Sequence, residues 1–406
     1  MIRDARIWFL CAALLAGCGK KAVHQALPNT AAPYLGATGP NVLAITVGAG
    51  TVCGQHGYVN EPCTTVHVCV PGTDNCQEIS DVLVDTGSVG LRVFSSALNI
   101  PLAQINDSGG NTLAECAQFG TGSAWGPLAS ADVVLGGESP VNVSIQIINT
   151  SYATIPSGCN QVDSSPQQAG YNGILGVGLF TEDCGPLCAA NTSARTYFSC
   201  NGDGNGSTCT STAVPVALQP QNPVAHLPTD NNGVVIAMSQ VDPEGSARAS
   251  GVLILGIETA ANNLPIQVNP YSTDGNGEFM TELSGQFIPG SFIDSGSNGL
   301  FFPNVAGLAG CSNSGPTASF YCMSSPQELT ATNSSATQDG KPQASVPFTV
   351  GNAESLVSGD NLALLNLAGT SAGGFDWGLP FFYGRAVFTG IQGRTSSMGT
   401  GPYFAY

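Results

Sequence analysis

The chain has 406 residues, including 52 glycines, 26 prolines and 14 cysteines, and its formal net charge at pH 7 is −17. This acidity argues against nucleic acid as a partner, because binding to phosphates needs clustered lysine and arginine. A chain of this length usually exceeds a single hydrophobic core, so we expect more than one domain.

Residues 1–18 have the pattern of a lipoprotein export signal. Two arginines precede an apolar stretch that ends in Leu15-Ala16-Gly17-Cys18. The stretch is too short to span a membrane, and a small-residue site ending in cysteine is typical of lipid attachment to that sulfur. Gly19 at the next position resembles the bacterial pattern sorted to the outer membrane. We expect an envelope lipoprotein anchored at Cys18; an ordinary secretory signal cut nearby is the alternative.

The rest of the chain predicts an all-β protein. Residues 19–40 are polar, rich in alanine and without a pattern, as in a tether. From residue 41 onward, short apolar runs alternate with turn clusters, which is typical of strands. The expected strands are 42–47, 64–70, 82–85, 132–135, 141–148, 234–239, 252–256, 292–294, 345–350 and 385–389. A short helix is expected at 305–311.

A proline-rich stretch at 213–228 is the best internal boundary, since few strands can cross it. It divides the chain into an N-terminal β lobe, 41–228, and a C-terminal β lobe, 229–406. The segment 191–212 is rich in Gly, Ser, Asn and Cys and predicts a surface loop pinned by Cys200 and Cys209.

The cysteines predict a disulfide framework. Of the 14, Cys11 and Cys18 belong to the export signal, so 12 remain. An even number in an exported chain favours up to six bridges, with local pairs such as Cys311 and Cys322 the safest. Cys184 and Cys188 are the only pair close enough to favour zinc, but no histidine lies near them. We therefore expect neither a metal nor a cofactor.

One short phrase occurs twice, as Val82-Leu83-Val84-Asp85-Thr86-Gly87-Ser88 and as Phe292-Ile293-Asp294-Ser295-Gly296-Ser297. In each copy an acid follows an apolar run, and a tight turn with small hydroxyl side chains comes next. Turn chemistry alone explains one copy but does not predict two. If the two acids meet, like charges about 3 Å apart cannot both ionise, so the pair holds one proton. Such a pair offers an acid and a base together, which is the chemistry that hydrolyses amides.

These residues resemble the pepsin-type, two-lobed aspartic peptidases. Phe119-Gly120-Thr121-Gly122-Ser123 is similar to the flap hairpin of that family, and the segment 171–178 resembles the one that threads behind the first catalytic loop. In the second half, 251–256 and 377–383 resemble the segments that play the matching roles. The amino-acid sequences of the two Asp motifs, together with a cysteine-bearing strand before the first, also resemble DUF3443. This is a family of exported bacterial proteins whose name implies no activity.

The pepsin-like resemblance implies that Asp85 and Asp294 activate a water for attack on a peptide carbonyl. The hydroxyl after each Asp would bond the other loop, each glycine would let backbone N–H groups approach, and each final serine would bond an outer carboxylate oxygen. These bonds would stabilise the ionised acid and separate the two titrations. The six supporting residues are Thr86, Gly87, Ser88, Ser295, Gly296 and Ser297.

The sequence departs from the family at the flap that would face the substrate. The candidate flap residues are Phe119, Gly120, Thr121 and Trp125. Phe119 stands where the flap usually has tyrosine. Arg92 stands where the family often has an indole, and its cation either lowers a nearby carboxylate's pKa or faces solvent. Trp125 either supplies an aromatic surface or packs in the core. The cysteine-rich insertion between residues 47 and 64 has no counterpart.

The function predicted is endopeptidase activity on extended peptides, by a monomer that meets the membrane through its anchor. The alternative is an envelope protein that binds a peptide or a glycan without turnover, since fold does not imply function. Paired carboxylates also serve glycoside hydrolysis, but that chemistry usually places them in different environments, and these loops are alike. The four histidines show no spacing typical of a metal site or a Ser/His pair.

Overall fold

The computed structural model describes residues 29–406, except 49, 51, 52, 55, 121, 203–206 and 313. The export signal, Cys18 and the first part of the expected tether lie outside the described residues, as does Thr121. Within this part of the chain, no helix is long and apolar enough to cross a membrane. The described end of the expected tether packs onto the fold, because Ala31 and Tyr34 are buried and the Tyr34 ring meets Phe388 edge-on at 5.8 Å.

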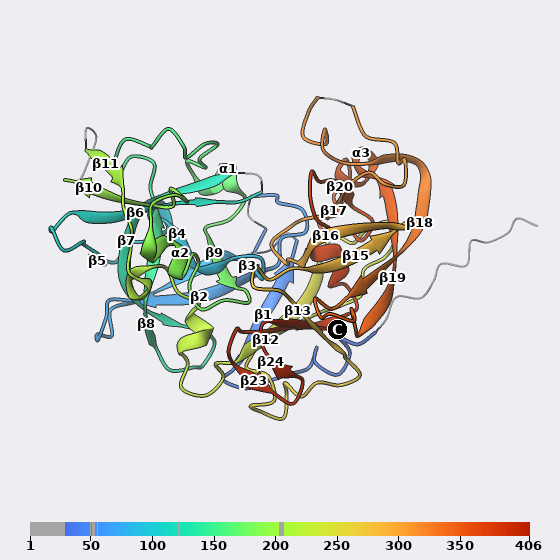
Figure 1. Cartoon of the computed structure of the whole chain (residues 1–406), viewed down its shortest axis with the longest axis horizontal. Coiled ribbons are helices and arrows are strands. Elements are labelled where there is room, and N and C mark those ends of the chain that lie inside the picture. Colours follow the sequence, from blue (N-terminus) through green and yellow to red (C-terminus); the bar gives the residue numbers. More distant parts are fainter. Residues whose placement is uncertain are drawn as a thin grey trace, which may run out of the picture.

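The all-β prediction is confirmed (Figure 1). The first half of the chain contributes β1 Val42–Val47, β2 Cys63–Cys69, β3 Cys76–Asp85, β4 Val89–Phe94, β5 Ala103–Gln104, β6 Thr112–Gln118, β7 Ser123–Val134, β8 Val141–Ile148, β9 Gly173–Val177, β10 Tyr197–Asn201 and β11 Thr208–Ser211. The second half contributes β12 Gly233–Met238, β13 Ala249–Leu255, β14 Pro270–Ser272, β15 Phe279–Leu283, β16 Gln286–Ile293, β17 Leu300–Phe302, β18 Cys322–Ser334, β19 Gln343–Asn352, β20 Ala368–Thr370, β21 Asp376–Trp377, β22 Ala386–Gly390, β23 Thr395–Ser396, β24 Gly399–Thr400 and β25 Tyr403–Ala405.

Helices in the described part are single turns or little more. The α-helices are α1 Pro166–Ala169, α2 Pro186–Ala190 and α3 Ala353–Val357, and the 3-10 turns are η1 Ser95–Ala97, η2 Val216–Leu218, η3 Pro223–His226 and η4 Leu379–Phe381. The helix predicted at 305–311 is wrong. Gly307 there has a φ of +67°, and the Asn304 side chain bonds both the N–H and the C=O of Leu308, which a helix would need.

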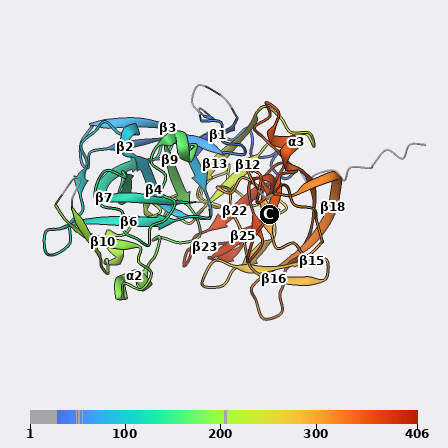
Figure 2. The ribbon, with the colours of Figure 1, turned by 90° about the horizontal axis from the view of Figure 1, so that it is seen from above.

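The strands form two main sheets. The larger runs in the order β11-β10-β6-β7-β8-β4-β9-β3-β2-β1-β13-β12-β22-β25-β14, and a further pairing of β2 with β7 closes its first part into a barrel. The smaller sheet runs β19-β18-β15-β16-β21-β17-β20. Figures 1 and 2 show the barrel on one side of the molecule and the smaller sheet on the other. Between them, β1 pairs with β13, so the central strands join segments that the sequence assigns to different lobes.

One pattern of strand pairing occurs in both halves. In the first, β3 pairs in parallel with β9, β9 antiparallel with β4, and β4 in parallel with β8. In the second, β16 pairs in parallel with β21, β21 antiparallel with β17, and β17 in parallel with β20. The repeated phrase therefore lies in a repeated structural unit, with the apolar run of each copy on the first strand of the unit.

The disulfide framework is also confirmed. Its six bridges are Cys53–Cys63, Cys69–Cys76, Cys116–Cys159, Cys184–Cys188, Cys200–Cys209 and Cys311–Cys322. Cys200 and Cys209 lie opposite each other on the hairpin of β10 and β11, so the described parts of the segment 191–212 include two strands where a loop was expected. A bonded pair removes the free thiolates that a metal would need. This applies to both groups of nearby Cys and acidic side chains in the described chain, Cys53/Cys63/Asp81 and Cys311/Cys322/Glu354.

Candidate functional site

The two Asp loops lie against each other and are joined by reciprocal hydrogen bonds. The Thr86 N–H donates to Ser295 Oγ at 3.1 Å, and the Ser295 N–H donates to Thr86 Oγ1 at 2.9 Å. Each hydroxyl then donates to the strand behind the other loop, Thr86 to Ile293 O at 3.2 Å and Ser295 to Val84 O at 2.7 Å. Thr86 is 3% exposed and Ser295 is fully buried, so this interlock is shielded from water.

The interlock brings the two carboxyls face to face. A methyl group at Gly87 would lie 2.5 Å from Asp294 Cγ, and one at Gly296 would lie 2.7 Å from Asp85 Cγ, so each glycine leaves room for the other loop's acid. The Gly87 N–H donates to Asp85 Oδ1 at 2.8 Å, and the Gly296 N–H donates to Asp294 Oδ1 at 2.7 Å. Ser88 Oγ donates to Asp85 Oδ2, and Ser297 Oγ lies 2.9 Å from Asp294 Oδ2.

The electrostatics of the pair keep a proton on it. Burial raises the pKa of Asp294 well above its ordinary value, and the neighbouring Asp85 carboxyl raises it further through its charge and a hydrogen bond. Two acids in contact titrate as a unit and release their protons in separate steps. The arrangement can therefore present one protonated and one ionised carboxyl side by side.

A third acid, Asp376 on β21, joins the cluster. Its Oδ2 lies 2.6 Å from Ser297 Oγ, and its Oδ1 is buried with no hydrogen-bond partner in the part of the chain that the structure describes. Ser297 has a single hydroxyl hydrogen and contacts two carboxyls, so one of these must be protonated and donate to the serine oxygen. Burial raises the pKa of Asp376 to about 7. Asp376 is thus a proton-bearing neighbour of the pair in acid solution.

Sequence analysis did not single out Asp376, although a signal was present. It stands two residues before Gly378, as Ile174 stands two residues before Gly176 in the first repeat. Ile174 is buried and apolar, as expected for that strand. An acid at the matching position of the second repeat is the departure that marks it.

The cysteine-rich insertion before β2 also reaches this region. Asn60 anchors it across the molecule, donating to Asn298 O at 2.7 Å and to Leu364 O at 2.8 Å and accepting from Tyr383 Oη at 2.7 Å. Tyr58 stands two residues before Asn60 in this insertion. Its pKa is raised by burial first and then by the carboxyls of Asp294, Glu61, Asp85 and Asp376, so its ring lies near the pair. The insertion thus contributes a buried tyrosine to the surroundings of the pair.

Glu61, in the same insertion, should make the folding stability of the protein depend on pH. It is 1% exposed, neither of its carboxyl oxygens has a hydrogen-bond partner among the described residues, and burial raises its pKa to about 9. The folded protein holds this proton while the unfolded chain loses it near pH 4, so stability falls as pH rises from about 4 to about 9. We expect Glu61→Gln to raise the melting temperature at pH 8 by roughly 5 °C or more and to leave it nearly unchanged at pH 4.

Scanning calorimetry of wild type and variant at both pH values measures this difference. Glu328→Gln, at an exposed glutamate, is the matched control and should change neither melting temperature. An equal effect of Glu61→Gln at pH 4 and pH 8 would show that packing, not ionisation, is responsible.

The expected flap is a hairpin of β6 and β7, closed by a Phe119 N–H to Gly122 O bond of 2.8 Å. Phe119 is partly buried and Gly120 is exposed at its turn. Trp125 is fully buried, meets Phe198 edge-on at 5.5 Å and donates its indole N–H to Ala153 O. Trp125 therefore belongs to the core of this hairpin, and the alternative of an aromatic surface for substrate is wrong.

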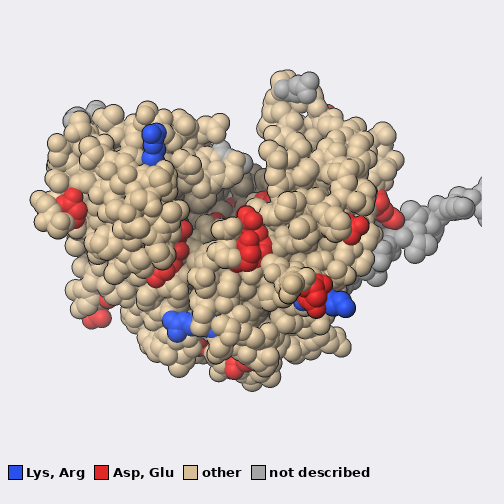
Figure 3. Space-filling model, in the orientation of Figure 1, with Lys and Arg blue, Asp and Glu red and all other residues tan. Residues whose placement is uncertain are grey.

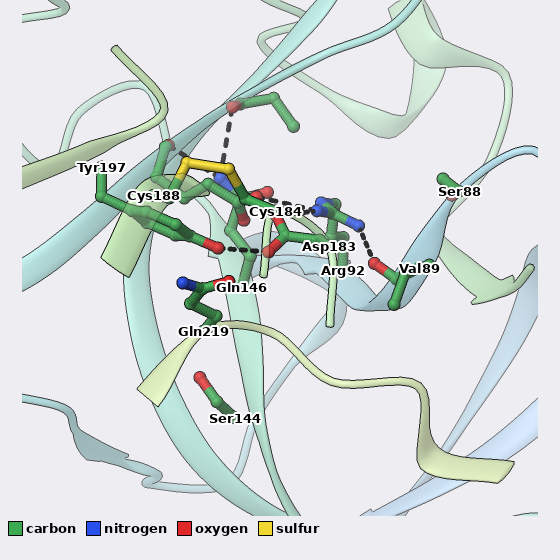
Figure 4. A network of polar contacts seen from close by, with 12 residues as sticks. Ser88, Val89, Arg92, Ser144, Gln146, Asp183, Cys184, Cys188, Tyr197 and Gln219 are labelled. Atoms are coloured by element: carbon green, nitrogen blue, oxygen red, sulfur yellow. Dashed lines mark hydrogen bonds and ion pairs between the residues drawn. A yellow bond between two sulfur atoms is a disulfide. The ribbon is translucent and has the colours of Figure 1, made fainter. Parts of the chain in front are cut away.

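Arg92 neither faces solvent nor contacts the pair. Its Nη2 lies 2.8 Å from Glu115 and 3.2 Å from Asp183, and its Nη1 donates to Val89 O (Figure 4). Tyr197 donates its hydroxyl to Asp183 in the same network. Residues from four separate segments meet here, and this partnership was not predicted from the sequence. Arg92 fixes the start of β4, which follows the first Asp loop.

Figure 3 shows a notch between the side that carries the barrel and the side that carries the smaller sheet. Gly87, at the tip of the first Asp loop, is exposed.

The fold and site define an all-β protein in which two repeated strand units bring their Asp loops together around a carboxyl pair, with Asp85 buried and Asp294 partly buried. The family model described as "Protein of unknown function (DUF3443)" matches residues 37–406, and the chain belongs to this family. The likeness to that family seen in the sequence is confirmed. A search of the curated proteins finds none that matches the chain.

Proposed function

We propose that the protein is an aspartic endopeptidase that hydrolyses peptide bonds with a water activated by Asp85 and Asp294. The observation that carries this proposal is the reciprocal interlock of Thr86 and Ser295, which sets the two carboxyls face to face. The raised pKa of Asp294 supports it, because the pair must hold one proton to act as acid and base.

In the proposed reaction the ionised carboxyl takes a proton from the water as the water oxygen attacks the peptide carbonyl carbon. The protonated carboxyl donates its proton to the carbonyl oxygen, giving a neutral tetrahedral diol. Collapse of this intermediate breaks the C–N bond, and the amine leaves with a proton from the carboxyl that had acted as base. The diol returns a hydroxyl proton to the pair, so one proton is restored and no covalent enzyme intermediate forms.

A pepsin-like, two-lobed architecture is part of the proposal. The pairing pattern shared by β3, β9, β4, β8 and by β16, β21, β17, β20 supports it, because one Asp loop belongs to each copy. The lobes are 41–228 and 229–406, and the substrate lies in the notch between them. The pairing of β1 with β13 makes the central strands common to both lobes.

The proposed location is the bacterial outer membrane, to which a lipid on Cys18 would anchor the peptidase. The six disulfides of the described chain support an oxidising compartment. The substrate is a peptide or an extended segment of a protein, and a monomer is sufficient, since both acids come from one chain.

Asp376 gives the proposal a distinctive pH dependence. Once Asp376 ionises, its charge holds the last proton on the Asp85/Asp294 pair, which delays the loss of activity at higher pH. Among the described residues, Tyr58 and Tyr171 also interact electrostatically with carboxyls of this cluster, and Glu61 interacts with both tyrosines. We expect Asp376→Asn to move the alkaline limb of the kcat/KM profile toward acid by about one pH unit and to leave the acid limb in place.

Initial rates of peptide cleavage across the pH range measure this shift. The acid limb is the internal control, because Asp376 is protonated there and differs little from asparagine. A parallel loss of rate at every pH would assign Asp376 a purely structural role, and an unchanged alkaline limb would remove it from the cluster.

Binding without turnover is the second candidate function. Trp125 is buried and Phe119 has no hydroxyl, so the hairpin offers little to grip a substrate. Incubating the full chain with a peptide library between about pH 3 and about pH 7 separates the two, since a carboxyl pair can share a proton in that range. Mass spectrometry should find new termini. Intact peptides retained by the protein, with no products, would support binding alone.

A further inference from the structure

A cavity lies on the side of the smaller sheet. Its volume is about 570 Å³, and neither Asp85, Asp294 nor any of their six supporting residues lines it. It is enclosed by β18 and β19, by the loop after β12 and by the segment around η4. Cavities of this size that are mostly apolar, with a few polar groups, are typical of small-molecule sites.

Apolar side chains form most of this wall. They include Leu329, Val346, Phe348, Leu365, Trp377 and Phe381. The exposed acids Asp242 and Glu328 also belong to the lining. Burying a hydrocarbon chain against these apolar side chains is favourable, because it removes apolar surface from water.

Arg385 is the cation of this cavity. It is 6% exposed, its Nη1 donates to Phe381 O at 2.6 Å, and its guanidinium lies 4.5 Å from the centre of the Phe381 ring. No ion pair of the described residues includes it. Burial lowers the pKa of Arg385 to about 10, which still leaves it charged at neutral pH.

Arg92 shows how the same chain treats its other deeply buried guanidinium. Arg92 is 3% exposed and has two carboxylate partners, Glu115 and Asp183. A buried charge without an opposite charge beside it is costly, and the cost falls when an anion pairs with it. Arg385 is therefore placed to receive an anion from outside the chain, at the wall of an apolar cavity.

We propose that this cavity binds a small amphipathic carboxylic acid, with its carboxylate on Arg385 and its hydrocarbon chain against the apolar wall. The planar guanidinium suits a carboxylate because it can donate two parallel hydrogen bonds. The exposed acids at the lining disfavour a ligand with a second negative charge. A monocarboxylate with a medium-length alkyl chain satisfies both requirements.

Decanoate below its micellar concentration is the probe, titrated into the full chain while tryptophan fluorescence is recorded. Trp377 lines the cavity, so a saturable change of emission is expected with decanoate. Decanol, which keeps the alkyl chain and lacks the charge, should bind at least about tenfold more weakly, because it leaves the guanidinium unpaired. Equal affinity for decanol, or no binding of decanoate, would overturn the proposal.

Two variants test the assignment to Arg385. Arg385→Met should weaken decanoate binding at least about tenfold while raising the melting temperature of the unliganded protein, since it removes an unpaired buried charge. Arg385→Lys keeps the charge and should retain part of the affinity. If Arg385→Met does not fold, Thr330→Trp, at an exposed lining position, should block entry instead. Unchanged decanoate affinity in Arg385→Met or in Thr330→Trp would contradict the site.

Discussion

Replacing Asp85 or Asp294 by asparagine is expected to lower the rate of peptide cleavage by at least about 1000-fold, because either change removes one partner of the acid–base pair. Asparagine has nearly the same shape, and the surrounding bonds from Gly87, Ser88, Gly296 and Ser297 leave the loops in place. The loss should therefore appear in kcat, with little change in KM. Rates with a peptide found in the library digest provide the measurement.

The matched control is Asp360→Asn, at an exposed aspartate outside the site, which should keep full activity. Pepstatin should inhibit the wild type and the Asp360→Asn protein alike. Substantial activity in either Asp85→Asn or Asp294→Asn would show that the pair does not carry the chemistry.

The second large effect is expected from Thr86→Val. Valine has the shape of threonine but lacks the hydroxyl, so the buried N–H of Ser295 loses its acceptor and the bond to Ile293 O is also lost. An unsatisfied buried donor costs about 1–3 kcal/mol of folding free energy. Because the same bonds set the distance between the carboxyls, activity should fall by roughly 100-fold as well.

Thr86→Ser is the control for this prediction, since it keeps the hydroxyl and loses only a methyl group. Denaturant unfolding and peptide cleavage should both place Thr86→Ser close to wild type. If Thr86→Val were as stable and active as Thr86→Ser, the interlock would not be what positions the pair.

Local signals in the sequence predicted much of the fold. The strands expected at 42–47 and 141–148 match β1 and β8, because alternating apolar residues and flanking turns mark a half-buried strand. The bridges Cys200–Cys209 and Cys311–Cys322 followed from short separations along the chain. The strand β18 was not predicted, because its residues Cys322–Ser334 are mostly polar and lack the apolar alternation that indicates a strand.

In the candidate site, too, local sequence signals predicted some features, and contacts between distant segments were missed. The repeated phrase predicted that Asp85 and Asp294 belong together, because two like turns imply two like structures. The partners of Arg92 and the anchor of Asn60 depend on segments far apart in the sequence, and a single sequence gives no sign of such contacts. Asp376 lies between the two cases: it was visible as an acid in an apolar strand, but only the fold brings it to Ser297.

The proposed chemistry has water as the nucleophile, and cleavage in water enriched in ¹⁸O tests this most directly. The account predicts that, in a single turnover, the N-terminal product carries one ¹⁸O in its new C-terminal carboxyl and the C-terminal product carries none. It also predicts that protein quenched during turnover keeps its unmodified mass. A protein mass increased by an acyl fragment, or the absence of any cleavage product between about pH 3 and about pH 7, would contradict hydrolysis by the Asp85/Asp294 pair.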